Sequence, residues 1–199
     1  MYKLYFDDIN EAKKTARPWE SNRVRNFKNW LKNNKLKEQN YFCCYCLRDL
    51  SSESYRAIHI EHVLPKSKFP AYVFDSHNLS VSCIKCNCDN KLNDTSFLNY
   101  SMDKYRQIWN YRVYDSSLYK FVHPKLDNIH AHIKRNLEAI NNRPCYIYKY
   151  FTSKGKYHYD FFKLAEFEVS DISRSQGLNT RISNSGAENI VDAIFRKHT

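Results

Sequence analysis

Glycine is scarce in this chain, with three copies in 199 residues. Gly155, Gly177 and Gly186 lie too far apart for a Walker A loop or a GxGxxG dinucleotide fingerprint. Long apolar runs are also lacking, and the N-terminus MYKLYFDDIN carries acids where a signal peptide needs a basic start. These absences argue against nucleotide hydrolysis by the chain itself and against a membrane span. We expect an intracellular, cytoplasmic protein.

Acidic residues are outnumbered, because 32 Lys and Arg stand against 21 Asp and Glu and give a net charge of +11. Such a surplus favours a polyanionic partner, since cations near phosphates release condensed counterions. The chain is also rich in Lys, Asn, Tyr and Ile together, so a coding bias explains the charge equally well. Hydrophobic residues make up 42% of the chain, which is enough for a folded core.

Six of the seven cysteines fall in two tight clusters: Cys43, Cys44 and Cys46, then Cys83, Cys86 and Cys88. In a reducing cytosol, paired CxxC knuckles indicate metal ligands before disulfides. Four thiolates are what a closed tetrahedral zinc site requires. The register can shift to Cys44 or Cys88, but a two-residue spacing lets both sulfurs of a knuckle face one ion. The preferred zinc ligands are therefore Cys43, Cys46, Cys83 and Cys86.

The first half of the chain alternates helix, strand and loop signals. Helical spacing predicts a helix from Pro18 to about Lys37, with one apolar face formed by Val24, Phe27, Trp30 and Leu31. Period-two alternation predicts a strand over 56–62, and Pro65 and Pro70 then break it. A second strand is expected over 78–83, followed by a polar helix near 87–92. The predicted order is strand, loop, strand, helix.

The second half is aromatic and predicts different elements. Asp127 can cap a helix whose apolar stripe is Ile129, Ile133, Leu137 and Ile140. The segments 145–151 and 157–162, on either side of 152–156, predict a β-hairpin. Ser185 and Glu188 form a capping box, which predicts an amphipathic helix at the end of the chain.

Between the two knuckles stands the run HIEHVLPKS, which contains Glu61 and His62; Asn78-Leu follows, and Asn87 comes directly after Cys86. This arrangement resembles the HNH endonuclease family over about a quarter of the chain. More narrowly, HIEHVLPKS with SCIKCN resembles the PtuB-type HNH proteins of Septu anti-phage systems, related versions of which accompany retrons. The resemblance implies a ββα-metal core, a PtuA-like ATPase partner or a retron complex, and nucleic acid as substrate, with DNA favoured.

The residue chemistry fits hydrolysis of a phosphodiester, which needs a deprotonated water and neutralisation of phosphate charge. His62 is the predicted general base, because a neutral imidazole accepts a proton at cellular pH. Glu61 and Asn87 offer oxygen ligands suited to Mg²⁺ or Mn²⁺. By the resemblance, Asn78 holds the loop and orients His62. Lys66 and Lys91 are the candidates for phosphate contact.

Two positions are not assigned by the HNH pattern. Relatives of this kind place a Lys three residues after the metal-binding Asn, whereas here Asn90 holds that place and Lys91 follows it. His59 shares a strand face with Glu61 and either binds metal or supports the site.

The sequence as a whole predicts an α+β protein. Its expected divisions are a basic helical segment over 1–40, an HNH nuclease core with a four-cysteine zinc knuckle over 41–99, and an aromatic-rich α+β segment over 100–199. The alternatives to a DNA endonuclease are an RNA (tRNA) endonuclease active only in complex with an ATPase, and a zinc-knuckle module that binds nucleic acid without cutting it.

Overall fold

The computed structural model describes residues 3–100, 113–140 and 143–168 of the chain. It has helices and two small antiparallel sheets, so the α+β prediction is confirmed. The chain divides into two compact units, Met1–Thr95 and Ser96–Thr199. The predicted C-terminal helix around Ser185 and Glu188 lies outside the described residues. None of the helices within the described ranges is long and apolar enough to cross a membrane.

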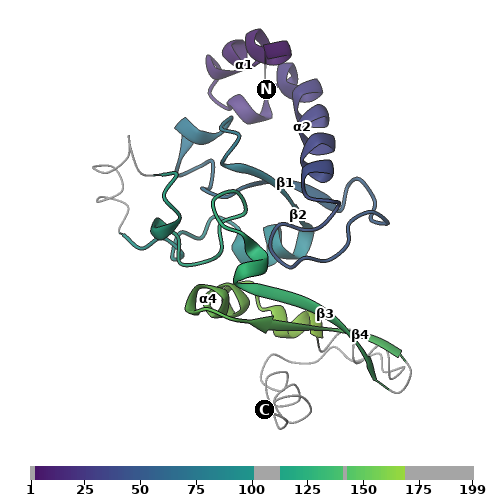
Figure 1. The fold of residues 1–199 in the computed structure, drawn as a ribbon. Helices are drawn as coiled ribbons and strands as arrows, with labels where there is room; N and C mark the ends of the chain where they lie inside the picture. Colours follow the sequence, from purple (N-terminus) through teal and green to yellow (C-terminus); the bar gives the residue numbers. More distant parts are fainter. Residues whose placement is uncertain (1–2, 101–112, 141–142, 169–199) are drawn as a thin grey trace. The chain divides into compact units, whose positions relative to one another are not determined.

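The first unit begins with helices and continues into a small sheet (Figure 1). Its regular elements are α1 (Phe6–Lys13), α2 (Arg25–Glu38), β1 (Ile58–His62), β2 (Leu79–Cys83) and a π-helix (Lys85–Lys91), with short 3-10 turns at Lys3–Tyr5, Pro18–Glu20, Asn22–Val24 and Pro70–Tyr72. The predicted order of strand, loop, strand and helix is therefore confirmed. The predicted long helix begins later than Pro18, because two 3-10 turns precede α2.

The two strands of the first unit form one antiparallel pair. Ile58 lies opposite Cys83 and His62 lies opposite Leu79, so the register places Glu61 opposite Ser80 and His59 opposite Ser82. Alternate residues of a strand point to opposite faces. One face of β1 therefore carries His59 and Glu61, and the other carries the remaining three side chains.

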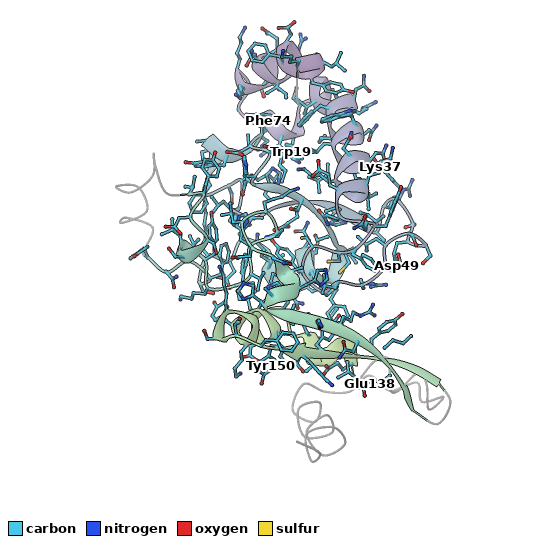
Figure 2. All side chains as sticks on the ribbon, in the orientation of Figure 1. Trp19, Lys37, Asp49, Phe74, Glu138 and Tyr150 are labelled. Atoms are coloured by element: carbon cyan, nitrogen blue, oxygen red, sulfur yellow. The ribbon has the colours of Figure 1, made fainter. Side chains whose placement is uncertain are left out.

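The core of the first unit forms where α2 packs against this sheet. Phe27 and Leu31 of α2 are buried with Val24, as their helical spacing predicts. They share one cluster with Leu79 of β2 and with side chains from α1 and the loop before β2: Ile9, Ala12, Val73 and Phe74. Trp19 completes the edge of this cluster; its ring lies 5.7 Å from that of Phe74 (Figure 2).

The second unit differs from its sequence-based prediction. Its elements are β3 (Ile133–Ile140), β4 (Arg143–Tyr150) and α4 (Ser153–Phe161), with 3-10 turns at Ser116–Leu118 and Ile129–Ala131. The helix predicted from Asp127 is wrong, because residues 133–140 form a strand that pairs with β4 along its whole length. Local spacing suggested a helix, but a partner strand with three tyrosines and an isoleucine favours the strand. Leu137 is exposed, so the predicted stripe is not a single buried face.

The predicted hairpin around 152–156 is also wrong, because this segment starts helix α4. The Thr152 hydroxyl accepts a hydrogen bond from the Gly155 N–H at 3.0 Å, which caps the helix. A Cβ atom at Gly155 would lie 2.2 Å from the His132 carbonyl oxygen. Glycine is therefore required at this position by the close approach of two backbone segments.

Candidate functional site

Four buried cysteines form a metal-binding cluster in the first unit, and they are the four preferred from spacing. The sulfur atoms of Cys43, Cys46, Cys83 and Cys86 all lie within 4.8 Å of one another. Zinc binds thiolates at about 2.3 Å, so sulfurs around a tetrahedral ion lie about 3.8 Å apart. The Sγ atoms of Cys46 and Cys83 are 3.8 Å apart. The cluster can hold a metal ion such as zinc.

Local backbone geometry brings the two knuckles together. Cys43 donates its N–H to the Arg48 carbonyl at 2.9 Å and accepts the Leu47 N–H at 3.1 Å, which closes the first knuckle. Leu47 has a φ of 54°, a left-handed conformation that this tight turn requires. The second knuckle begins at the end of β2, where the Cys83 N–H donates to the Cys43 sulfur at 3.3 Å. The Cys44 side chain is buried but does not join the cluster.

The burial of the cluster calls for a bound cation if its thiols are to ionise. Burial raises the pKa of the Cys46 and Cys86 thiols well above the ordinary value, whereas at Cys43 hydrogen bonds from the neighbouring thiols outweigh burial and hold the pKa well below it. Thiolates are the form that binds zinc, and a buried thiolate needs a nearby positive charge. The ion would therefore supply the charge that four buried sulfurs lack.

Glu61 is held on the face of β1 that also carries His59. It is 1% exposed. Its Oε1 atom accepts a hydrogen bond from the Tyr45 hydroxyl at 2.9 Å and pairs with the Lys91 ammonium at 2.8 Å. Lys91 also donates to the His62 carbonyl at 2.9 Å. A cation thus already neutralises this carboxylate in the structure.

The same face of the sheet holds polar groups that the sequence analysis did not single out. Ser80 and Ser82 lie opposite Glu61 and His59, and both serines are fully buried. Neither hydroxyl has a hydrogen-bond partner among the described residues. Buried hydroxyls of this kind usually bind water or an ion. His59 contacts Cys88 through its Nδ1 atom, 3.3 Å from the sulfur.

His62 points to the opposite face of β1 from Glu61. Its Nε2 atom lies 3.0 Å from the Val73 carbonyl oxygen, and its ring meets the edge of Trp19 at 4.5 Å between centroids. A carbonyl only accepts hydrogen bonds, so Nε2 carries the proton and Nδ1 carries the lone pair. Burial lowers the pKa of His62 to about 4, so the imidazole is neutral at pH 7.

Asn78 fastens the loop that carries the Val73 carbonyl. Its side-chain oxygen accepts the Leu64 N–H at 2.6 Å, and its amide donates to the carbonyls of Leu64 at 3.1 Å and Tyr72 at 3.0 Å. Tyr72 immediately precedes Val73, the acceptor for His62. Asn78 therefore holds the loop next to the carbonyl that lies against His62 Nε2.

The other predicted site residues differ in how accessible they are. Asn87 lies half-buried directly after Cys86 in the π-helix. Lys66 remains partly exposed and forms an ion pair with Glu20. Lys91, predicted to contact phosphate, is 1% exposed and paired with Glu61, so in this arrangement its ammonium is not open to a ligand.

Sequence reasoning missed three contacts that define the surroundings of the site: Tyr45 on Glu61, the Val73 carbonyl on His62, and Trp19 against the His62 ring. The contact of Tyr45 had a weak sequence signal, since an aromatic residue stands between Cys43 and Cys46 of the first knuckle. The other two contacts come from loop conformations that no motif encodes. No family model matches the chain, and neither does any curated protein or solved structure.

Proposed function

We propose that this protein is a metal-dependent endonuclease of the HNH class that hydrolyses phosphodiester bonds of nucleic acid. The observation that carries the proposal is the state of His62. A neutral imidazole with its proton fixed on Nε2 by the Val73 carbonyl keeps the Nδ1 lone pair available to deprotonate a water. Three hydrogen bonds from Asn78 to the surrounding loop support this arrangement.

In this proposal the antiparallel pair β1–β2 and the helix Lys85–Lys91 form a ββα-metal core. Glu61 and Asn87 would hold Mg²⁺ or Mn²⁺, because carboxylate and amide oxygens suit these ions. Glu61 and His62 leave β1 on opposite faces, but His62 is the last residue of the strand, so in this proposal they serve one site at the strand end. Such an ion neutralises charge on the phosphate and on the leaving oxygen. The four cysteines, from the first knuckle, the end of β2 and the π-helix, would hold a separate structural zinc that braces the core.

The Glu61–Lys91 ion pair restricts how a divalent ion can bind Glu61 in this mechanism. The Lys91 ammonium lies 2.8 Å from the carboxylate oxygen that a divalent ion would use. A metal must therefore displace Lys91 or share Glu61 with it. A released Lys91 would become available to a phosphate, which is the role that the sequence predicts.

The cellular role follows from the resemblance. The protein would be the effector of a bacterial anti-phage system, with DNA as the favoured substrate and a PtuA-like ATPase or a retron complex as partner. The net charge of +11 supports a nucleic-acid ligand. An RNA endonuclease that needs its ATPase, or a binder that does not cut, would give different results in the following test.

The test is cleavage of plasmid, single-stranded DNA and total tRNA by purified protein, with and without added Mg²⁺ or Mn²⁺. His62→Ala should reduce the rate by about 10²–10⁴-fold, as expected for loss of a general base. His77→Ala is the matched control, since His77 is exposed and lies outside this site. Zinc content is measured in each sample, so that loss of the structural zinc is not mistaken for loss of the general base His62.

The proposal is supported if cleavage depends on the metal, is lost in His62→Ala and is retained in His77→Ala. The substrate that is cut would then identify the substrate class. Binding without cutting, with and without an ATPase of the PtuA type, would overturn it in favour of the non-cleaving module. Cleavage of tRNA but of neither DNA substrate, and only when the ATPase is present, would favour the ATPase-dependent RNA endonuclease.

A further inference from the structure

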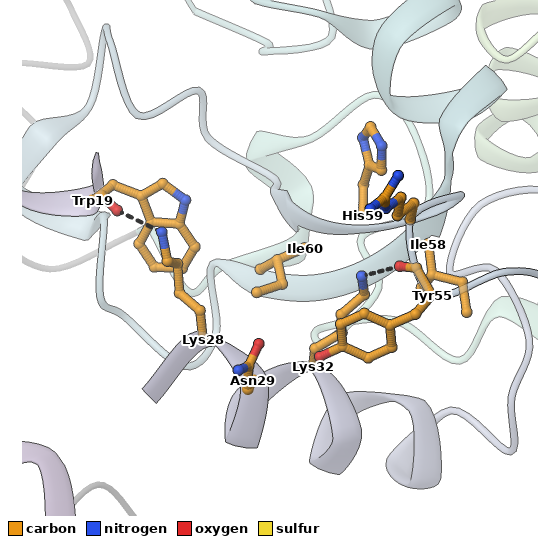
Figure 3. Close-up of a pocket in the computed structure, with 9 residues that line it drawn as sticks. Trp19, Lys28, Asn29, Lys32, Tyr55, Ile58, His59 and Ile60 are labelled. Carbon is orange, nitrogen blue, oxygen red and sulfur yellow. Dashed lines mark hydrogen bonds between the residues drawn. The ribbon is translucent and has the colours of Figure 1, made fainter. Parts of the chain in front are cut away.

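A pocket of about 310 Å³ lies between α2 and β1 in the first unit (Figure 3). Ligand sites usually occupy roughly 300–1,000 Å³, so this volume suits a group of the size of one nucleotide. The lining residues come from the turn before α2, from α2, from the approach to β1 and from β1: Trp19, Lys28, Asn29, Lys32, Tyr55, Arg56, Ile58, His59 and Ile60.

The charge of the lining is positive. Lys28 and Lys32 lie one turn apart on α2, and Arg56 is exposed two residues before β1. None of the described residues that line the pocket is acidic. The ammonium groups of both lysines donate to backbone carbonyls, Lys28 to that of Trp19 at 3.0 Å and Lys32 to that of Tyr55. Burial lowers the pKa of Lys28 and Lys32, so an anion in the pocket would stabilise the charged form of both side chains.

An aromatic ring accompanies a lysine at each end of the pocket. Lys28 lies 5.6 Å from the centre of the Trp19 ring, and Lys32 lies 3.7 Å from that of Tyr55. Figure 3 shows these two pairs on either side of Ile60. Tyr55 is 46% exposed, so part of its ring is open to solvent. Cations beside flat apolar surfaces are what proteins use to hold the phosphate and the base of an unpaired nucleotide.

The pocket lies next to His62. Trp19 lines it and also meets the His62 ring edge-on at 4.5 Å. Ile60 lines it and precedes His62 by two residues, so both side chains project from the same face of β1. A ligand in the pocket would therefore lie beside the predicted general base.

We propose that this pocket binds one unpaired nucleotide of the substrate, with the phosphates on its two sides against Lys28 and Arg56 and its base against Tyr55. The inference rests on the proposed function and deepens it. It assigns single-stranded nucleic acid, or a single-stranded segment of a larger substrate, as the substrate class. A paired base in a duplex has both faces covered and cannot stack on this ring.

The test measures binding apart from cutting. Fluorescein-labelled dT12, a duplex of the same length and an abasic strand are titrated by anisotropy against full-length protein carrying His62→Ala, without added divalent ion. Lys28→Gln and Arg56→Gln remove cations of the pocket, and Tyr55→Leu removes a ring. Lys37→Gln is the matched control, because Lys37 is an exposed cation of α2 outside the pocket (Figure 2). Melting temperatures check that each variant is folded.

We expect dT12 to bind more tightly than the duplex. Removing each pocket cation should make the negative slope of log K against log salt less steep by about 0.7, as expected for one lost contact to a single strand. Tyr55→Leu should weaken binding of dT12 about tenfold and binding of the abasic strand far less, as expected when one base is unstacked. Lys37→Gln should change neither the slope nor the preference for a base.

Three results would overturn the inference: no binding of dT12, tighter binding of the duplex, or pocket variants that behave like Lys37→Gln. The cleavage assay above reports separately on the proposed function. A protein that cuts through His62 but ignores Lys28, Arg56 and Tyr55 would keep its function and lose this pocket as a substrate site.

Discussion

Each of the two units of this protein is stabilised internally by a different kind of interaction. In the first unit, four buried sulfurs and a set of buried polar pairs order a chain with little regular structure between Glu38 and Ile58. In the second unit, aromatic rings pack on one another: the ring of Phe121 lies 4.3 Å from that of Phe97 and 5.5 Å from that of Phe162. The first unit adds a thiolate cluster and buried polar pairs to its apolar core, whereas ring packing predominates in the described part of the second.

A polar centre in the second unit surrounds Asp127. This carboxylate accepts hydrogen bonds from the Ser116 hydroxyl and from the His123 N–H at 2.7 Å, and it pairs with Lys154 at 2.7 Å. These contacts tie a 3-10 turn, a loop and α4 together. They give the run from His123 to Asp127 a structural role.

The largest expected effect comes from the thiolate cluster. Cys46→Ser should lose the bound zinc and most of the order of the first unit, because structural zinc contributes about 10–16 kcal/mol of apparent binding free energy at neutral pH. Cys44→Ser is the control, since Cys44 is buried but lies outside the cluster. Metal analysis should find one zinc per chain in the wild type and in Cys44→Ser.

Hydrogen exchange shows whether the two units respond differently to this change. Amides of β1 and β2 should lose protection in Cys46→Ser while those of β3 and β4 keep theirs. Equal loss in both units, or none in either, would break the contrast drawn between them.

The next effect concerns the buried pair of Glu61 and Lys91. Lys91→Met should destabilise the protein by about 3–5 kcal/mol, because it leaves a buried carboxylate without its cation. Added Mn²⁺ should recover part of that loss in the variant and raise the melting temperature less in the wild type. Lys85→Met, on the same helix, is the comparison. An identical response to Mn²⁺ in all three proteins would count against Glu61 as a metal ligand.

The polar centre of the second unit gives the third prediction. Asp127→Ala should lower the free energy of unfolding by about 3 kcal/mol, since it removes hydrogen bonds to a charged group and leaves Lys154 unpaired. Asp160→Ala should change it by about 0.5 kcal/mol or less, because the pair with Lys156 is exposed. Urea unfolding measures both values.

The pH dependence of Asp127 has a definite sign. Burial raises the pKa of this carboxyl, but Lys154, Ser116 and the His123 N–H together lower it below the ordinary value. Its contribution is therefore present above the unfolded pKa of about 3.9 and is lost as the pH falls below that value. The stability gap between wild type and Asp127→Ala should narrow below about pH 4. A gap that widens there would contradict the assignment.

The smallest effect is expected at Asn78. Asn78→Ala should cost about 2 kcal/mol, because it leaves the backbone groups of Leu64 and Tyr72 without their partner. Asn26→Ala, on the exposed face of α2, should be neutral or slightly stabilising. Cleavage should fall in Asn78→Ala and not in Asn26→Ala. Full cleavage by a folded Asn78→Ala would remove the positioning role.

The contrast between the units also explains what the sequence could predict. The four cysteines, the two strands and the helix after them follow from spacing over a few residues, and these predictions are confirmed. The pairing of β3 with β4 was missed because the spacing of Ile129 to Ile140 points to a helix until the partner strand is known. Helix α4 was missed because residues 152–156 resemble a hairpin turn. The burial of Lys91 and the contact of His62 with Val73 depend on how loops close, which no local pattern encodes.

The most direct test of the central claim is rescue of a missing base. His62→Gly is assayed for single-turnover cleavage of the substrate found above, with Mg²⁺ or Mn²⁺ and increasing imidazole. If His62 supplies the Nδ1 lone pair that activates water, the variant is inactive alone and regains activity in proportion to imidazole. His77→Gly cuts normally and does not respond. A His62→Gly protein that cuts like the wild type, or that no concentration of imidazole restores while its fold and zinc are intact, would contradict the account.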